Sequence, residues 1–119
     1  MQILDFLTLK GLAYTDTQNS YDKLLNICDA KDFLKIAEEE HVPIIGADIY
    51  KKNDNNVYSM DDTFDLSWSC ECIAGEDITY KCYFDRSIRM AKRGLNNVSD
   101  RMRKNNTNLY INFVIPSLS

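Results

Sequence analysis

Few residues in this chain have the types and spacing that enzymes use for chemistry. Asp61, Asp62 and Asp65 form a group of neighbouring carboxylates, and such groups can bind a divalent cation or act as a hydrolytic pair. The stretch lacks the ordered acidic positions and the glycine of a calcium-binding loop. Nothing in the sequence fixes the separation of the carboxylates. We therefore predict neither a metal site nor a catalytic pair here.

The histidine and the cysteines are also poor candidates for catalysis. His41 is the only histidine, and no Ser-His-Asp or Cys-His set can be spaced around it, so we expect it to interact with a helix end. Cys70 and Cys72 do not have the two-residue spacing of zinc ribbons. We expect these thiols and Cys82 to pack in the core. With no glycine-rich phosphate loop either, the sequence predicts a protein that is not an enzyme and uses no cofactor.

The length and composition predict one folded domain. The chain has 119 residues, of which 45% are hydrophobic and 27% charged, as in ordinary globular proteins. We therefore expect residues 1–119 to form a single domain. The sequence has no run of about 20 apolar residues that would span a membrane, and its first residues lack the features of a signal peptide. We expect a cytoplasmic protein with reduced cysteines.

Charged residues are unevenly distributed along the chain. Between residues 53 and 77 all seven charged side chains are acidic, whereas residues 78–119 carry eight basic and two acidic ones. The net charge of −4 and the pI of about 4.9 do not favour binding to phosphate backbones or anionic lipid. An acidic surface attracts basic proteins and increases their association rate. The charges therefore predict a basic protein partner, with nucleic acid and membranes disfavoured.

The hydrophobic pattern predicts helices in the first part of the chain. Residues 3–12 form one predicted helix, which ends near Gly11. Ser20 and Asp29 are expected to cap two further helices before His41. The apolar residues of the last of these recur at steps of three and four, which is typical of a helix that packs on a core.

A long basic helix is predicted at residues 85–104, with Asp85 as its N-cap. Its basic residues are Arg86, Arg89, Lys92, Arg93, Arg101, Arg103 and Lys104. Together with Tyr80 and Tyr83 as stacking groups, they define an alternative function for this chain, as a small nucleic-acid-binding or regulatory domain. Core packing already explains the apolar stripe of this helix, and its basic residues can be explained simply as the side that faces solvent.

Alternation of apolar and polar residues predicts the strands. We expect strands at residues 42–50, 57–60 and 109–115, with a turn at residues 51–56 between the first two. Gly46 is expected to permit a bulge or a close approach of two backbones.

A further hairpin is predicted between residues 66–72 and residues 78–84, which alternate in the same way. Only a register with Cys70 opposite Cys82 keeps both apolar sets on one face, and Trp68 then points into the core. The elements together predict an α+β fold, with a mostly antiparallel sheet of four to five strands and about three helices packed on one face.

Two motifs in the middle of the chain have a recognisable composition. Residues 44–50 read Ile-Ile-Gly-Ala-Asp-Ile-Tyr, and residues 65–71 read Asp-Leu-Ser-Trp-Ser-Cys-Glu. They resemble two segments of the Immunity protein 40 family, namely apolar residues followed by Gly-Gly-Asp-Val-Tyr, and Asp-Asn-Trp-Tyr-Cys-Glu.

The resemblance extends beyond these motifs. Tyr80, Ser87 and Ala91 stand where that family has a tyrosine, then a serine, then an alanine ahead of a helix. The similarity covers about residues 30–115, and it departs from the family pattern at Ala47, which replaces the second glycine.

The resemblance implies an immunity protein of a bacterial polymorphic-toxin or contact-dependent growth-inhibition system. Such a protein binds the C-terminal domain of one cognate toxin in the cytoplasm and neutralises it without catalysis. Nuclease toxins have basic clefts because they hold phosphates, so an acidic inhibitor suits a nuclease.

We expect the acidic stretch to contact the toxin, with Tyr58 as an anchor among carboxylates. The expected contact residues are Asp54, Tyr58, Asp61, Asp62, Asp65, Glu71, Glu76 and Asp77. Asp48 either caps a loop or faces the toxin, and the sequence leaves both options open, as it does for the role of Tyr50.

Overall fold

The computed structural model describes most of the chain, namely residues 2–12, 23–55, 57–61, 63–70 and 79–116. These residues contain three helices, α1 (Ile3–Lys10), α2 (Ile27–Glu39) and α3 (Tyr80–Asn105). They also contain a four-stranded sheet of β1 (Gly46–Lys52), β2 (Tyr58–Met60), β3 (Trp68–Ser69) and β4 (Leu109–Val114). All strand pairs are antiparallel. The predicted α+β fold is confirmed.

Strand β1 organises the sheet, because every other strand pairs with it. Strand β4 lies along one edge of β1, with Gly46 opposite Val114 at one end. Strands β2 and β3 share the other edge, where β2 pairs with the C-terminal end of β1 and β3 with its N-terminal end. Between them, residues 63–67 belong to no strand. Strands β2 and β3 therefore form one edge strand that a loop interrupts.

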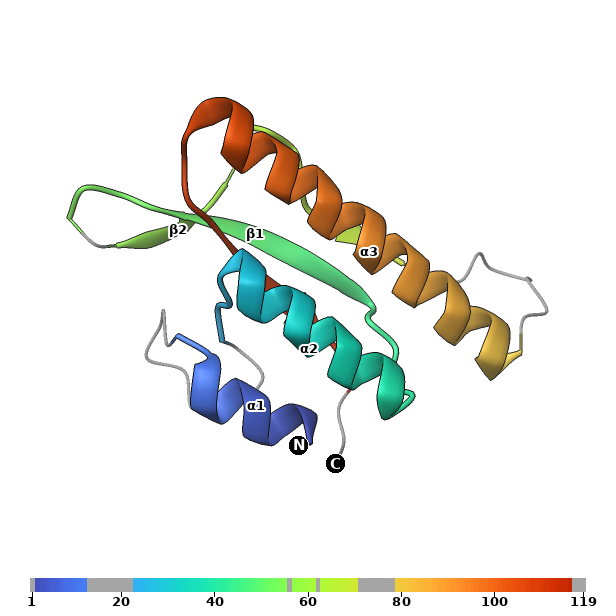
Figure 1. The fold of residues 1–119 in the computed structure, drawn as a ribbon. Coiled ribbons are helices and arrows are strands. Elements are labelled where there is room, and N and C mark those ends of the chain that lie inside the picture. The colour runs from blue at the N-terminus through green and yellow to red at the C-terminus, as the bar shows by residue number, and fades with distance from the viewer. Residues whose placement is uncertain (1, 13–22, 56, 62, 71–78, 117–119) are drawn as a thin grey trace.

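The helices form a second layer on one face of this sheet. Helices α2 and α3 lie side by side, α2 contacts β4 and α3 contacts β1, and α1 packs against α2 (Figure 1). Because side chains alternate along a strand, only every second residue of β1 and β4 points toward the helices. The buried residues on that side are Ala47, Ile49, Leu109, Ile111 and Phe113.

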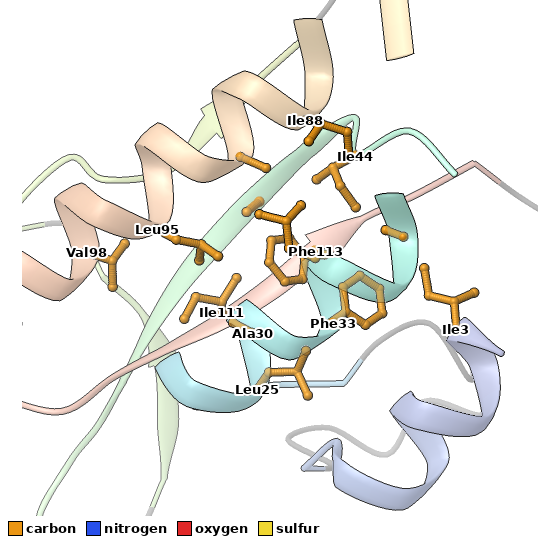
Figure 2. Close-up of a cluster of buried hydrophobic side chains, with 14 of the residues drawn as sticks. Ile3, Leu25, Ala30, Phe33, Ile44, Ile88, Leu95, Val98, Ile111 and Phe113 are labelled. Carbon is orange, nitrogen blue, oxygen red and sulfur yellow. The ribbon is translucent and has the colours of Figure 1, made fainter. Parts of the chain in front are cut away.

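The hydrophobic core lies between the two layers (Figure 2). The ring of Phe33 from α2 stacks on that of Phe113 from β4, with 5.0 Å between the centroids. Phe6 of α1 lies 6.1 Å from Phe33 on its other side. The rings thus connect the first helix, the second helix and the sheet, which makes Phe33 the central residue of the core.

Helix α2 begins earlier than its predicted cap Asp29 implies. Its N-cap is Asn26, whose side chain accepts a hydrogen bond from the backbone N–H of Asp29 at 2.8 Å, so the prediction of Asp29 as the cap is wrong. Leu24 and Leu25 are extended and form backbone bridges to other segments. Successive side chains of an extended segment point to opposite sides, so the two buried leucines pack in different directions. The predicted cap Ser20 lies outside the described residues.

The predicted hairpin between residues 66–72 and 78–84 is wrong. Helix α3 begins at Tyr80, and Cys82 is exposed on its first turn, whereas Cys70 is buried. The two cysteines therefore do not face each other across a ladder. The prediction of a core thiol is confirmed for Cys70 and wrong for Cys82, and Cys72 lies outside the described residues.

The capping residue explains why the helix starts there. The Thr79 hydroxyl accepts a hydrogen bond from the backbone N–H of Cys82 at 3.2 Å, as an N-cap does, so Asp85 is not the cap. Phe84 then begins the apolar stripe that continues through Ile88 and Ala91. Five alternating residues fit the first turns of a helix as well as a strand, and the cap decides between the two.

Candidate partner-binding site

The structure describes four of the eight expected contact residues. Asp54 and Tyr58 lie on the β1–β2 hairpin, and Asp61 and Asp65 lie in or at the start of the loop before β3. The other four, Asp62, Glu71, Glu76 and Asp77, lie outside the described residues. All four described residues follow the same edge of the sheet, but they do not form one continuous acidic patch.

The β1–β2 hairpin projects beyond the helices (Figure 1). Its turn is held by the Asn53 side chain, whose oxygen accepts hydrogen bonds from the backbone N–H groups of Asn55 and Val57 at 2.9 Å each. This local pairing leaves Asp54 exposed at the tip. The predicted turn is confirmed, and a self-contained turn of this kind holds Asp54 in a defined position without help from the core.

Tyr58 is half-buried on the hairpin, and its ring is held on two sides. The Tyr110 ring of β4 meets it edge-on with 5.1 Å between centroids. The Lys52 ammonium lies 5.6 Å from the Tyr58 centroid, a cation–π contact. The ring is therefore ordered before any partner arrives, which lowers the entropy lost on binding.

Asp61 is buried, with only 7% of its surface exposed. Its carboxylate accepts hydrogen bonds from the backbone N–H groups of Thr63 and Phe64 at 3.4 and 3.2 Å. Its own N–H donates to the Ile49 carbonyl of β1 at 2.7 Å. Asp61 therefore fixes the point where the chain leaves the sheet, and its carboxylate stabilises the loop.

Asp65 is exposed, but it lies beside the basic helix. Its backbone has a φ of 54°, a left-handed conformation that aspartate tolerates better than most residues. Asp65, Trp68 and Arg93 line the same hollow against α3. Nearby, the Arg101 guanidinium lies 5.0 Å from the Phe64 ring. The acidic and basic stretches are separate in sequence, yet the structure brings this loop and α3 together.

Helix α3 uses several of its polar groups within the chain. The Lys92 ammonium lies 3.4 Å from the Glu38 carboxylate of α2, and Arg103 lies 2.6 Å from Asp100. Both pairs are solvent-exposed, so each contributes little to stability. They nevertheless offset part of the positive charge that the alternative nucleic-acid function requires.

The two tyrosines expected as stacking groups hold the start of α3. The Tyr80 hydroxyl donates to the His41 carbonyl and the Tyr83 hydroxyl to the Cys70 carbonyl, both at 2.6 Å. His41 follows the C-terminal end of α2, and its ring stacks on Phe84 at 5.5 Å. These contacts position α3 against the ends of α2 and β3.

Several residues of the two sequence motifs and of the pattern that follows them hold the elements of the fold together. Ser87 is completely buried. Its hydroxyl donates a hydrogen bond to the Phe84 carbonyl at 2.9 Å and accepts one from the Ile44 N–H at 3.1 Å. A Cβ atom on Gly46 would lie 2.5 Å from the Trp68 carbonyl oxygen, so the predicted close approach of two backbones is confirmed. These residues serve the fold.

Asp48 and Tyr50 lie on the opposite face of the sheet. They alternate with the buried Ala47 and Ile49 of β1, so they point away from the helices. Asp48 lies within β1 and not in a loop. The sequence analysis did not group Tyr50 with Tyr110, because only the register of β1 and β4 places them opposite each other.

Other chemistry finds no support in the part of the chain that the structure describes. No three His, Cys, Asp or Glu residues there lie close enough together to hold a metal ion. None of the three helices has the length and apolar composition needed to cross a membrane.

The sequence model of the Immunity protein 40 family matches residues 16–115, so the chain belongs to this family. Immunity proteins neutralise toxins, which implies a cognate toxin as the partner. Comparisons with curated proteins and with solved structures gave no match.

Proposed function

We propose that this chain neutralises a nuclease toxin by binding its C-terminal domain in the cytoplasm, without catalysis. The system would be contact-dependent growth inhibition or another polymorphic-toxin system. Family membership supports toxin neutralisation. The acidic stretch supports a nuclease, because a cleft that holds phosphates is basic and is attracted to carboxylates.

The observation that carries the proposal is the charge of residues 53–77, whose seven charged side chains are all acidic. The described part of this stretch runs along one edge of the sheet. We assign contact to Asp54 and Tyr58 on the hairpin and loop stabilisation to Asp61. Long-range attraction is assigned to the other acids, Asp62, Asp65, Glu71, Glu76 and Asp77.

Co-expression with the toxin domain encoded beside this chain tests the proposal. Cells that make both proteins should survive, and the two should co-purify. We expect survival to require the intact chain, and we expect the free toxin to have nuclease activity. Toxicity that persists despite folded chain would contradict the proposal, and so would retention of the chain on a nucleic-acid column that fades with salt.

Charge reversal at the hairpin tests the acidic contact. Asp54→Lys should lower the rate of association with the toxin domain about tenfold at low salt, and this rate should depend less on ionic strength. The control is Asp32→Lys on the exposed side of α2, which changes net charge by the same amount. Equal rates for the two variants would remove the hairpin tip from the interface.

A further inference from the structure

The side chains on the sheet face opposite the helices are unusual for a solvated surface. A sheet with one wet face normally alternates apolar residues inward and polar residues outward. Here we define the tyrosine face by the outward residues of β1, β2 and β4, which are Gly46, Asp48, Tyr50, Lys52, Tyr58, Met60, Tyr110, Asn112 and Val114. Five of these nine are aromatic or large and apolar, and Met60 and Val114 are 51% and 40% exposed. Clustered, partly exposed apolar side chains of this kind mark interaction sites.

The aromatic residues of this face are contiguous across the strands. Tyr50 lies directly opposite Tyr110 on β4 and opposite Met60 on β2. Tyr58 then reaches across β1 to the Tyr110 ring at 5.1 Å. Tyrosine offers a large contact area with few rotatable bonds, which is why it dominates the centres of protein interfaces. The cluster therefore has the composition and the order of an interface centre.

We propose that the tyrosine face is the surface on which the toxin domain docks. This inference rests on the proposed function, and Tyr58 belongs both to the expected contact residues and to this face. The interface would then extend from the hairpin tip across β2, β1 and β4. The helices, on the other side of the sheet, stay free of the partner.

The position of the Asp48 carboxylate beside the tyrosine rings favours a basic partner for this face over a second copy of the chain. Among the described strand residues that point outward, Asp48 is the only carboxylate, and the one ammonium, that of Lys52, lies over Tyr58. An arginine or lysine of a basic toxin can meet the Asp48 carboxylate and the tyrosine ring faces together. A two-fold contact between copies centred here would instead bring two Asp48 carboxylates close together.

A pair of double variants with equal charge change tests the docking surface. Asp48→Lys with Met60→Lys places two cations on the tyrosine face, and Asp32→Lys with Leu9→Lys places two on exposed positions of the helices. Affinity for the purified, catalytically inactivated toxin domain is measured by titration calorimetry. The face variant should bind at least about 30-fold more weakly, as for a hot spot, and the helix variant within about threefold of wild type.

A footprint of the unmodified protein supplies a second measurement that does not depend on variant folding. Hydroxyl-radical oxidation, read by mass spectrometry, should be lost at Met60 and Tyr58 in the complex and unchanged at Leu9 and Tyr80. Failure of the wild-type chain to bind the toxin would overturn the proposed function and this inference together. The docking surface alone would be overturned if the wild-type chain bound the toxin tightly while Met60 stayed unprotected and the two variants had equal affinities. Dimerisation of the chain through Met60 would also overturn it.

Discussion

Two aromatic pairs lie on opposite faces of the same sheet at almost the same separation. Phe33 and Phe113 stack at 5.0 Å between the sheet and the helices, and Tyr58 and Tyr110 meet edge-on at 5.1 Å on the helix-free side. The first pair is buried, whereas both tyrosines are only half-buried. Similar ring contacts can thus stabilise a fold on one face and prepare a binding surface on the other.

Strand β1 shows the same difference between its two sides, residue by residue. Ala47 and Ile49 point into the core, whereas Asp48 and Tyr50 point away from it. Substitutions on the inner side should therefore reduce stability, and substitutions on the outer side should reduce binding.

The largest expected effect is on the inner side of the sheet. Phe33→Ala removes the central ring of the core and should lower the free energy of unfolding by about 3–5 kcal/mol. Urea denaturation followed by circular dichroism measures it. A loss below about 1 kcal/mol would mean that the inner pair is no more important for stability than the outer one.

Removal of the buried hydroxyl of α3 should have the next largest effect. Ser87→Ala leaves the buried Ile44 N–H without its acceptor and should cost about 1–3 kcal/mol. Ser99→Ala on the same helix serves as the control, since Ser99 is only half-buried. Equal stability of the two variants would contradict the anchoring role of Ser87.

A smaller loss is expected at Gly94. Alanine is preferred over glycine in helices by about 1 kcal/mol, but a Cβ atom here would lie 2.5 Å from the Trp68 ring. We expect Gly94→Ala to destabilise by about 1–2 kcal/mol, because overpacking outweighs helix propensity. Trp68 is the only tryptophan, so its fluorescence should report the displacement. A gain in stability with unchanged emission would contradict this packing.

The smallest effect on stability is expected on the tyrosine face. Met60→Lys should change the free energy of unfolding by no more than about 0.5 kcal/mol, because its side chain is half exposed. Thermal unfolding of the free chain measures this change. A loss of several kcal/mol would show that the outer face also carries the fold, and the contrast between the faces would fail.

The sequence predicted the elements whose patterns are long. The stripe of α3 through Ile88, Ala91 and Leu95 and the alternation of β4 both appear in the structure as expected. Short patterns failed, because the start of α3 alternates like a strand and only the Thr79 cap identifies it as a helix. The sequence around Leu24 does not reveal its backbone pairing with Leu12, so Leu24 was assigned to a helix.

The candidate site was predicted less completely, because charge along a sequence does not give charge in space. Asp61 satisfies backbone groups of its own loop, and Asp65 lies against basic α3. The turn at Asp54 was recognised because its asparagines pair locally. The tyrosine face depends on the register of three strands, and no single stretch of sequence contains it.

The interruption between β2 and β3 has a further consequence for the behaviour of this protein at high concentration. A long uninterrupted strand at the edge of a sheet is a template on which other chains add strands and aggregate. Here that edge consists of three paired residues in β2 and two in β3, separated by a loop that Asp61 and Phe64 tie down. The interruption therefore limits the length of backbone that another chain could pair with at this edge.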